Sequence, residues 1–177
     1  MKDRLDRSAF LKTAGVLSVS LPVIAPTLAY GRVITPPGSD LGFGKTIWQE
    51  LKGIPELSIL LGLIDETGLK QILNQIPLLY GYTLFAPNDD AFKAFGGGIK
   101  EIKHLLRTLE NIVVPELVLL SGLLGGLLGT LGGIPLGITR TKGNILVDEV
   151  AKIIKGDIRA SNGVIHIIDA VPKQIIV

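Results

Sequence analysis

Apolar residues recur every three or four positions between Thr46 and Asn74. This spacing predicts amphipathic helices, and Pro55 and Gly68 divide the stretch into about three short ones. The residues expected to face the core are Ile47, Trp48, Leu51, Leu57, Ile59, Leu60, Leu63, Ile64, Leu69, Ile72 and Leu73.

A run rich in β-forming residues follows at positions 82–86, and Pro87 ends it. Asn88 is a good N-cap, and acidic side chains at the next two positions favour a helix start because they complement the helix dipole. Glycines at 96–98 end this helix. Residues 99–109 then predict a further amphipathic helix, with Leu105 and Leu106 facing inward.

The second half of the chain predicts strands. Residues 112–114 form a short buried strand that ends at Pro115. Later strand-like runs are 136–141, 144–147, 153–160 with a break at Gly156 and Asp157, and 163–169. Helices first and strands last is the order of an α+β protein, because a doubly wound sheet alternates the two element types.

The length and composition of the chain are those expected for a single folded domain. The chain has 177 residues, of which 47% are hydrophobic and 19% charged, and it has no cysteine. Disulfides, thiolate nucleophiles and sulfur-bound metals are therefore excluded. Residues 1–29 hold four basic and two acidic side chains, so the rest of the chain carries fourteen of each sign. A neutral domain lacks the basic surface that nucleic-acid binding needs.

The first residues have the pattern of an export leader. Charged residues at positions 2–7 precede an apolar run at 14–29, with small residues before Tyr30. We expect residues 1–29 to be a signal peptide; an uncleaved N-terminal membrane anchor is the alternative. A twin-arginine motif is incomplete, because Ser8 stands where its second arginine belongs. Residues 30–44 are rich in proline and glycine and predict a flexible tether.

The candidate catalytic residues do not form a convincing set. Ser161, His166 and Asp169 lie close in sequence, but positions 166 and 169 of one strand point to opposite faces. His166 is therefore interpreted as a hydrogen-bonding residue that fixes the last strand. The chain is predicted not to be an enzyme.

Two ligand motifs are also rejected, so no metal or cofactor is predicted. Asn88, Asp89 and Asp90 lack the spaced ligands and the distal glutamate of a calcium loop, and helix capping explains them better. Residues 42–46 have the ending of a phosphate loop, but its first glycine would have to be at Ser39.

Two longer segments resemble the signature blocks of the fasciclin-like domain family. They are Thr-Leu-Phe-Ala-Pro-Asn-Asp-Asp-Ala-Phe at 83–92 and Ala-Ser-Asn-Gly-Val-Ile-His-Ile-Ile-Asp at 160–169. The resemblance covers about residues 45–175 and implies an α+β fasciclin-like domain at 45–177, a compact β-wedge or sandwich flanked by several short helices. The motif residues, taken as structural, are Thr83, Phe85, Ala86, Pro87, Asn88, Asn162, Gly163, His166 and Asp169.

The resemblance also implies a function. Members of that family are generally adhesive or matrix-associated, act outside cells, and bind proteins or carbohydrate. We therefore expect a non-enzymatic adhesion or binding module, exported to the periplasm, cell surface or extracellular space, with a cell-envelope or matrix protein or polysaccharide as partner. The family often has a Tyr-His pair before Val-Val-Pro, linked to receptor binding in animal members. Here Asn111 and Ile112 stand there, so integrin recognition is not predicted.

Residues 117–138 are the least typical part of the chain. They carry no charge and are long enough to cross a bilayer, with glycine pairs four apart. Because the resemblance places them between two core strands, we expect a helix or loop at 117–128 and a turn at 130–133. An exposed apolar surface here would contact a partner or lipid, and a lipid or small-molecule binding protein is the alternative function. The candidate contact residues are Leu117, Leu119, Leu120, Leu123, Leu124, Leu127 and Leu128.

Overall fold

A curved sheet forms the centre of the computed structural model, which describes residues 44–77, 80–95 and 105–172. The sheet order is β2-β1-β7-β6-β5-β4-β3. Its strands are β1 (Tyr82–Pro87), β2 (Val113–Val114), β3 (Gly126–Leu128), β4 (Leu136–Thr141), β5 (Asn144–Val147), β6 (Ala151–Ala160) and β7 (Gly163–Ile168). Only the β1–β7 pair is parallel; the other five strand pairs in these residues are antiparallel.

The sheet curls so that its two ends approach each other. Leu131, just beyond β3, donates a backbone hydrogen bond of 2.8 Å to the carbonyl of Val113 on β2. The strands predicted at 136–141 and 144–147 are confirmed with the same bounds. The predicted break in the next strand is also confirmed, as an irregularity in the β6–β7 pairing where Asp157 has φ 56°.

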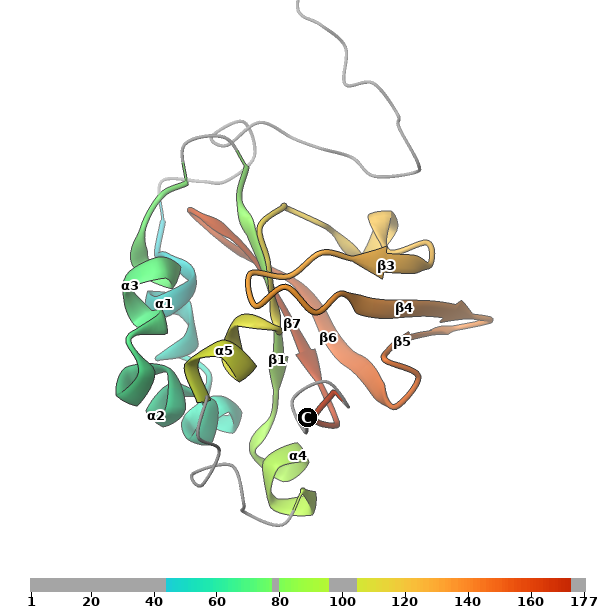
Figure 1. Cartoon of the computed structure of the whole chain (residues 1–177), viewed down its shortest axis with the longest axis horizontal. Helices are drawn as coiled ribbons and strands as arrows, with labels where there is room; N and C mark the ends of the chain where they lie inside the picture. Colours follow the sequence, from blue (N-terminus) through green and yellow to red (C-terminus); the bar gives the residue numbers. More distant parts are fainter. Residues whose placement is uncertain (1–43, 78–79, 96–104, 173–177) are drawn as a thin grey trace, which may run out of the picture.

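Helices cover one side of β1 and β7 (Figure 1). They are α1 (Ile47–Leu51), the 3-10 turn η2 (Pro55–Leu57), α2 (Ser58–Thr67), α3 (Leu69–Asn74), α4 (Asp89–Ala94) and α5 (Leu105–Glu110). The helices expected between Thr46 and Asn74 are confirmed. Apart from β1, the strands of the described residues all follow α5, and this order of helices before strands confirms the α+β class.

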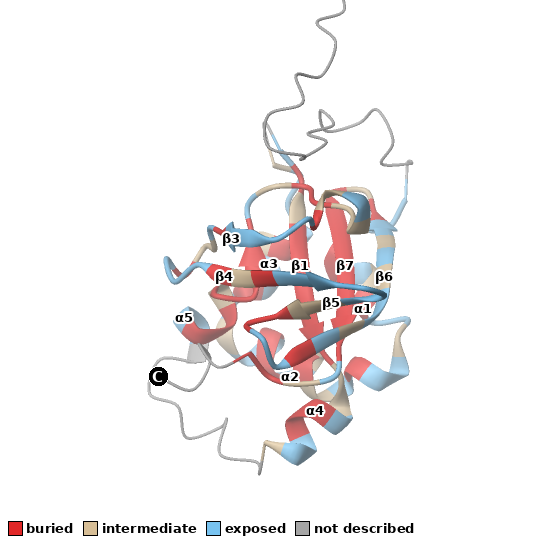
Figure 2. Cartoon of the chain, turned by 90° about the vertical axis from the view of Figure 1, so that its right-hand side faces the viewer, coloured by how far each residue is buried: buried red, intermediate tan, exposed pale blue. Residues whose placement is uncertain are grey.

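Two apolar cores lie on opposite faces of β1 and β7. Alternate residues of a strand point to opposite faces. Leu84 and Ile165 therefore pack against the helices, whereas Phe85 and Ile168 pack inside the curve of the sheet. Figure 2 shows β1 and β7 buried between these layers, while β4 and β5 leave much of their outer side exposed.

Three sequence expectations need correction or fall outside the described residues. Leu106 does not face inward: 41% of it is exposed, whereas Leu109, three positions later in α5, is buried. Residues 117–128, expected to be a helix or a loop, form a loop with the 3-10 turn η4 (Leu120–Gly122) and then the unpredicted strand β3. The predicted leader, most of the tether, the glycines at 96–98 and residues 99–104 lie outside the described residues.

The uncharged segment 117–138 forms no helix of membrane-spanning length. All of its residues are described, and they form a loop, η4, β3 and the start of β4. No helix within the described ranges is long and apolar enough to cross a bilayer. The predicted turn at 130–133 is confirmed by a hydrogen bond from the Gly133 nitrogen to the Thr130 carbonyl.

Candidate contact surface

Val118 connects the two sequence blocks that resemble the family signature. Thr83 on β1 accepts a 2.8 Å hydrogen bond from the Val118 nitrogen, and its hydroxyl donates to the Glu116 carbonyl at 2.6 Å. His166 on β7 lies with Nε2 2.8 Å from the Val118 carbonyl oxygen. One residue from each block therefore fixes the start of residues 117–124, which we call the leucine loop.

His166 is fully buried and uses both ring nitrogens. Its Nδ1 accepts a 3.2 Å hydrogen bond from the Asp157 backbone nitrogen, so Nε2 carries the proton and donates to Val118. Burial lowers the pKa of His166 below its usual value, and the Val118 hydrogen bond and the Asp157 charge oppose this shift. The imidazole is therefore neutral near pH 7 and has a structural task.

The residues considered for a catalytic triad have separate roles. Asp169 accepts a 2.7 Å hydrogen bond from the Lys152 backbone nitrogen, next to the start of β6. The Ser161 nitrogen donates to the Lys45 carbonyl. Neither ring nitrogen of His166 is bonded to Ser161 or Asp169. These three residues are not brought together as a nucleophile, a base and an orienting acid.

Asn162 joins the helices to the β6–β7 turn. Its side-chain oxygen accepts a 2.7 Å hydrogen bond from the Ile47 nitrogen at the start of α1. Its amide nitrogen donates to the carbonyls of Leu73 and Gln75 at the end of α3, both at 2.8 Å. The next residue, Gly163, has no room for a side chain, because a Cβ would overlap the backbone carbonyl of Tyr82.

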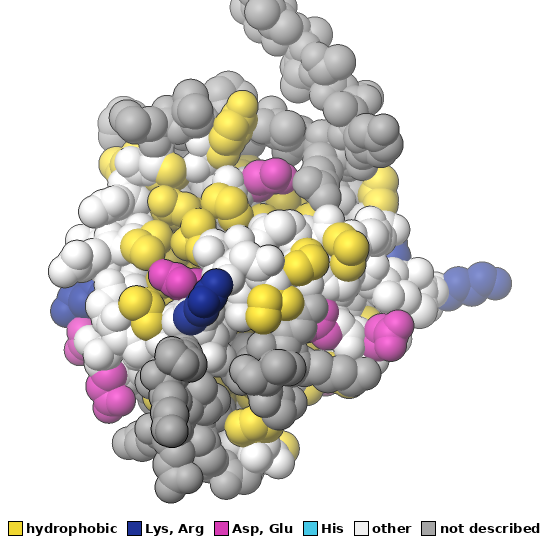
Figure 3. Space-filling view, viewed as in Figure 1, with side chains coloured by type: hydrophobic (Ala, Val, Ile, Leu, Met, Phe, Trp, Pro, Cys, Tyr) yellow, Lys and Arg dark blue, Asp and Glu magenta, His cyan; other side chains and the backbone are white. Residues whose placement is uncertain are grey.

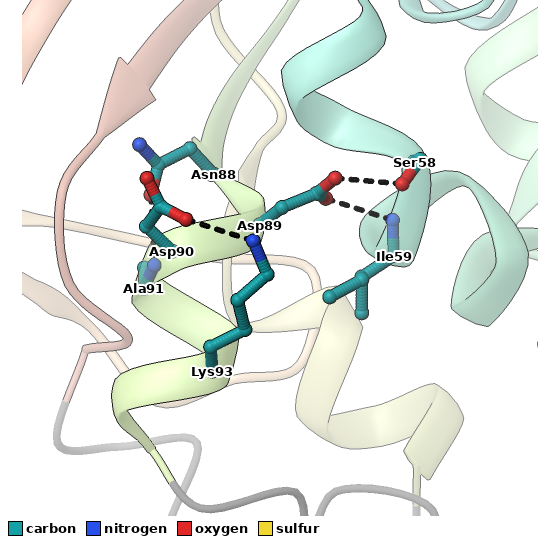
Figure 4. A network of polar contacts seen from close by, with 7 residues as sticks. All are labelled: Ser58, Ile59, Asn88, Asp89, Asp90, Ala91 and Lys93. Atoms are coloured by element: carbon teal, nitrogen blue, oxygen red, sulfur yellow. Dashed lines mark hydrogen bonds and ion pairs between the residues drawn. The ribbon is translucent and has the colours of Figure 1, made fainter.

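Asn88 and Asp89, which directly follow β1, cap two different helices (Figure 4). Asn88 caps α4, as predicted, by accepting a hydrogen bond from the Ala91 nitrogen. Asp89 reaches α2 instead, where it accepts hydrogen bonds from the Ser58 hydroxyl at 2.6 Å and the Ile59 nitrogen at 2.9 Å. No group of three or more potential metal-binding His, Cys, Asp or Glu side chains occurs in the part of the chain that the structure describes.

Asp90 has no part in the Asn88 cap of α4 or in the contact between Asp89 and α2. Its carboxylate pairs with Lys93 at 2.9 Å on the surface of α4 and raises the pKa of that lysine. Sequence reasoning assigned Asp89 and Asp90 the same role, because the approach of α2 to α4 has no local signal in the sequence.

The predicted contact surface is smaller than the seven leucines proposed for it. Leu117, Leu123 and Leu128 are buried, and Leu119 and Leu120 are half-buried. Leu124 and Leu127 remain, with 55% and 65% of each residue exposed. We call this pair the apolar edge. Figure 3 shows other apolar side chains distributed over the face that carries α5, β3 and β4.

Asn111, at the position where the family often has tyrosine, is also internal. It is 3% exposed, and its Oδ1 accepts hydrogen bonds from the Thr130 hydroxyl at 3.2 Å and the Ile134 nitrogen at 3.3 Å. Ile112 is fully buried. Both residues therefore stabilise the turn before β4 and the helix-side core, and they present no exposed motif.

Comparison with known proteins identifies the family. The model of the fasciclin domain matches residues 55–172. This chain belongs to the fasciclin domain family. A solved structure of a FAS1 domain pair from the insect cell adhesion molecule Fasciclin I aligns with TM-score 0.61 and 17% identity, over 75% of this chain and 53% of that one. This likeness confirms the fasciclin-like fold.

Curated relatives of this fasciclin-domain chain come from animals and a cyanobacterium. It is 33% identical over 147 residues to transforming growth factor-beta-induced protein ig-h3 of Sus scrofa, covering 79% of this chain and 20% of the relative. It is 33% identical to human periostin, covering 71% of this chain and 15% of that protein. Protein sll1483 of Synechocystis is 35% identical over 97 residues, 51% of this chain and 53% of that protein. The chain thus spans a fifth or less of the two animal proteins and about half of the cyanobacterial one.

Proposed function

We propose that this chain is a non-enzymatic adhesion or binding module that acts outside the cytoplasm through contacts with a protein or polysaccharide. The observation that carries the proposal is that polar side chains of the two signature blocks bond to the backbone inside the domain. Thr83, Asn162 and His166 are buried and bonded to backbone groups. Such side chains stabilise the fold and leave partner recognition to the exposed surface.

Family membership supports the same function, since the FAS1 domain pair with this fold comes from a cell adhesion molecule. Export is supported by the charged and then apolar pattern of the first 29 residues. We propose a signal peptide or anchor at 1–29, a tether at 30–44 and the fasciclin domain at 45–177. The tether would hold the domain away from the membrane or the preceding chain.

The apolar edge is our candidate for the partner contact. Leu124 and Leu127 are more than half exposed and flank the start of β3, at one end of the sheet order. Leucines that are already exposed, one in β3 and one just before it, bury apolar area on binding.

The test is photo-crosslinking of the purified chain to cell-envelope proteins and surface polysaccharides from its own host. Binding should be saturable and should fall at least tenfold in a Leu124→Ser/Leu127→Ser double variant. Ile154→Ser is the matched control, because Ile154 is 48% exposed on β6. Absence of saturable binding to any envelope protein or glycan would contradict the proposed function. Equal loss in both variants would remove the apolar edge as the contact.

A lipid or small-molecule binding function is the second candidate, supported by the same exposed leucines. Native mass spectrometry of the chain purified from its own host distinguishes it. A co-purifying lipid that the double variant loses would favour this function, and a clean unliganded mass would rule it out.

A further inference from the structure

The leucine loop is held against the sheet by side chains from four strands. Its backbone is bonded by Thr83 of β1, His166 of β7, Asp157 of β6 and Arg140 of β4. Val118 and Leu123 of this loop belong to the core inside the curve of the sheet. Histidine is the residue type in this set whose charge ordinarily changes between pH 5 and 8.

We propose that His166 is an acid-sensitive latch: protonation of its imidazole releases the leucine loop from the sheet while the helices stay folded. The latch rests on contacts inside the domain and is independent of the proposed binding partner. Its output is the exposure of Val118 and Leu123, which are both 2% exposed in the closed state.

Protonation conflicts with the hydrogen bonds around the ring. Nδ1 accepts from the Asp157 nitrogen at 3.2 Å. An imidazolium carries a proton on both nitrogens, so its Nδ1–H would face the N–H of Asp157, and neither group would have an acceptor there. One of the two must move. Asp157 has φ 56° within the irregular part of β6, so its present geometry depends on the contacts around it.

The Asp157 carboxylate cannot stabilise an imidazolium and also keep the loop closed. The Asp157 carboxylate attracts an imidazolium, but its Oδ1 accepts the 2.8 Å hydrogen bond from the Leu120 nitrogen. If the carboxylate turns to Nδ1–H, the Leu120 nitrogen loses its acceptor. If the backbone of Asp157 moves away, the same bond is stretched. Both responses to protonation therefore loosen the loop at Leu120.

Three further described side chains near the ring or the loop do not supply an acceptor for a second proton. Phe85 of β1 faces the imidazole with ring centroids 5.5 Å apart. Thr83 already donates to Glu116 and accepts from Val118. Arg140 of β4 carries positive charge and donates to the carbonyls of Leu120 and Leu123. Among the described residues, Asp157 and Arg140 are charged side chains that bond to this loop, and Asp157 gives the ring the two responses above.

The difference in the pKa of His166 between the closed and the open loop determines the pH range over which the loop opens, and whether acid favours the open form. The pKa of His166 is lowered in the closed state because the ring is buried, whereas in the open state the ring is in water with a pKa near the usual 6.5. The closed loop therefore has its full stability above about pH 6.5 and loses it as pH falls further. Each unit below that value raises the ratio of open to closed loop up to about tenfold.

Hydrogen–deuterium exchange of the full chain at pH 7.5 and pH 5.0, corrected for the intrinsic exchange rate, tests the latch. The amides of Val118 and Leu120, both bonded to side chains of the sheet, report on the loop, and those of α2 report on the helices. We expect the opening ratio of the loop to rise up to about thirtyfold at pH 5.0, with no comparable change in α2. Unchanged loop protection, or a parallel loss in loop and helix, would overturn the proposal.

A matched pair of variants separates the latch from general acid effects. His166→Gln keeps an amide donor for Val118 without a titrating group, so its loop protection should no longer depend on pH in this range. His104→Gln removes the other histidine of the sequence and should retain the wild-type response. A pH response that persists in His166→Gln would overturn the latch.

If His166→Gln does not fold, NMR of the wild-type chain tests whether protonation of His166 opens the loop. The midpoint at which the carbon-bound ring protons of His166 titrate should coincide with the midpoint of loop opening. Loop opening while the ring is still neutral would overturn the proposal.

Discussion

The side-chain oxygen of Asn162 lies 2.7 Å from the backbone nitrogen of Ile47, although the two residues are 115 positions apart. The same side chain donates to two carbonyls at the end of α3. Asn162 is therefore the residue through which the β6–β7 turn fixes both the first and the third helix. Its fully buried position makes each of these bonds costly to lose.

We expect Asn162→Ala to lower the free energy of unfolding by about 3 kcal/mol, because one backbone N–H and two carbonyls lose their partner. Urea denaturation followed by circular dichroism measures this change. Asn144→Ala, at the exposed start of β5, is the control and should change stability by less than about 0.5 kcal/mol. Similar losses in both variants would contradict the role of Asn162.

The two aspartates that follow Asn88 should differ in their contribution to stability. Asp89 provides acceptors for the hydroxyl of Ser58 and the nitrogen of Ile59, so Asp89→Ala removes the cap of α2 and should cost about 1 kcal/mol. Asp90→Ala breaks only an exposed pair with Lys93 and should cost clearly less. Urea midpoints of the two variants, measured together, decide the order; the reverse order would refute the link between α2 and α4.

Two glycines should respond differently to a methyl group. A Cβ at Gly163 would overlap the Tyr82 carbonyl where β7 lies against β1, so Gly163→Ala should destabilise the domain by about 2 kcal/mol. Gly129 has no atom within 4 Å of the same position, and Gly129→Ala should be neutral or slightly stabilising. Thermal unfolding measures both. A tolerated Gly163→Ala would show that β1 and β7 separate easily at this point.

Adjacent leucines of the leucine loop test the division between core and surface. Leu123 is 2% exposed and Leu124 is 55% exposed. We expect Leu123→Ala to cost about 3 kcal/mol because it leaves a cavity in the core inside the sheet. Leu124→Ala should change the free energy of unfolding by less than about 0.5 kcal/mol. Equal costs in denaturant titration would mean that the loop packs differently.

Helices, strands and caps were predicted correctly where the residues that determine them lie within a few positions of one another. The strands at 136–141 and 144–147 have the predicted bounds because alternation and the intervening turn are encoded within a few positions. Asn88 caps α4 as predicted, since its acceptor and the Ala91 nitrogen are three residues apart. By contrast, Leu106 of α5 is exposed because the neighbours of a short helix, and not its own spacing, decide which leucine is buried.

The candidate contact surface was less predictable. The uncharged run at 117–138 is compatible with a helix, a loop or a membrane span, because it has no charged residues that mark an exposed face. Pairing of β3 with β4 resolves this: Leu128 lies opposite Leu136 in the core, while Leu127 next to it points away and is exposed. A one-residue shift in this register would exchange their roles.

The sequence by itself determined the α+β class, the family, and the residues that cap, turn or alternate locally. The tertiary structure alone decided that Thr83 and His166 meet at Val118, that Asp89 caps a distant helix, and that Leu124 and Leu127 remain outside. The physical reason is the range of each interaction. Propensity and capping act over three or four residues, whereas these contacts join positions at least 30 apart that only the completed sheet brings together.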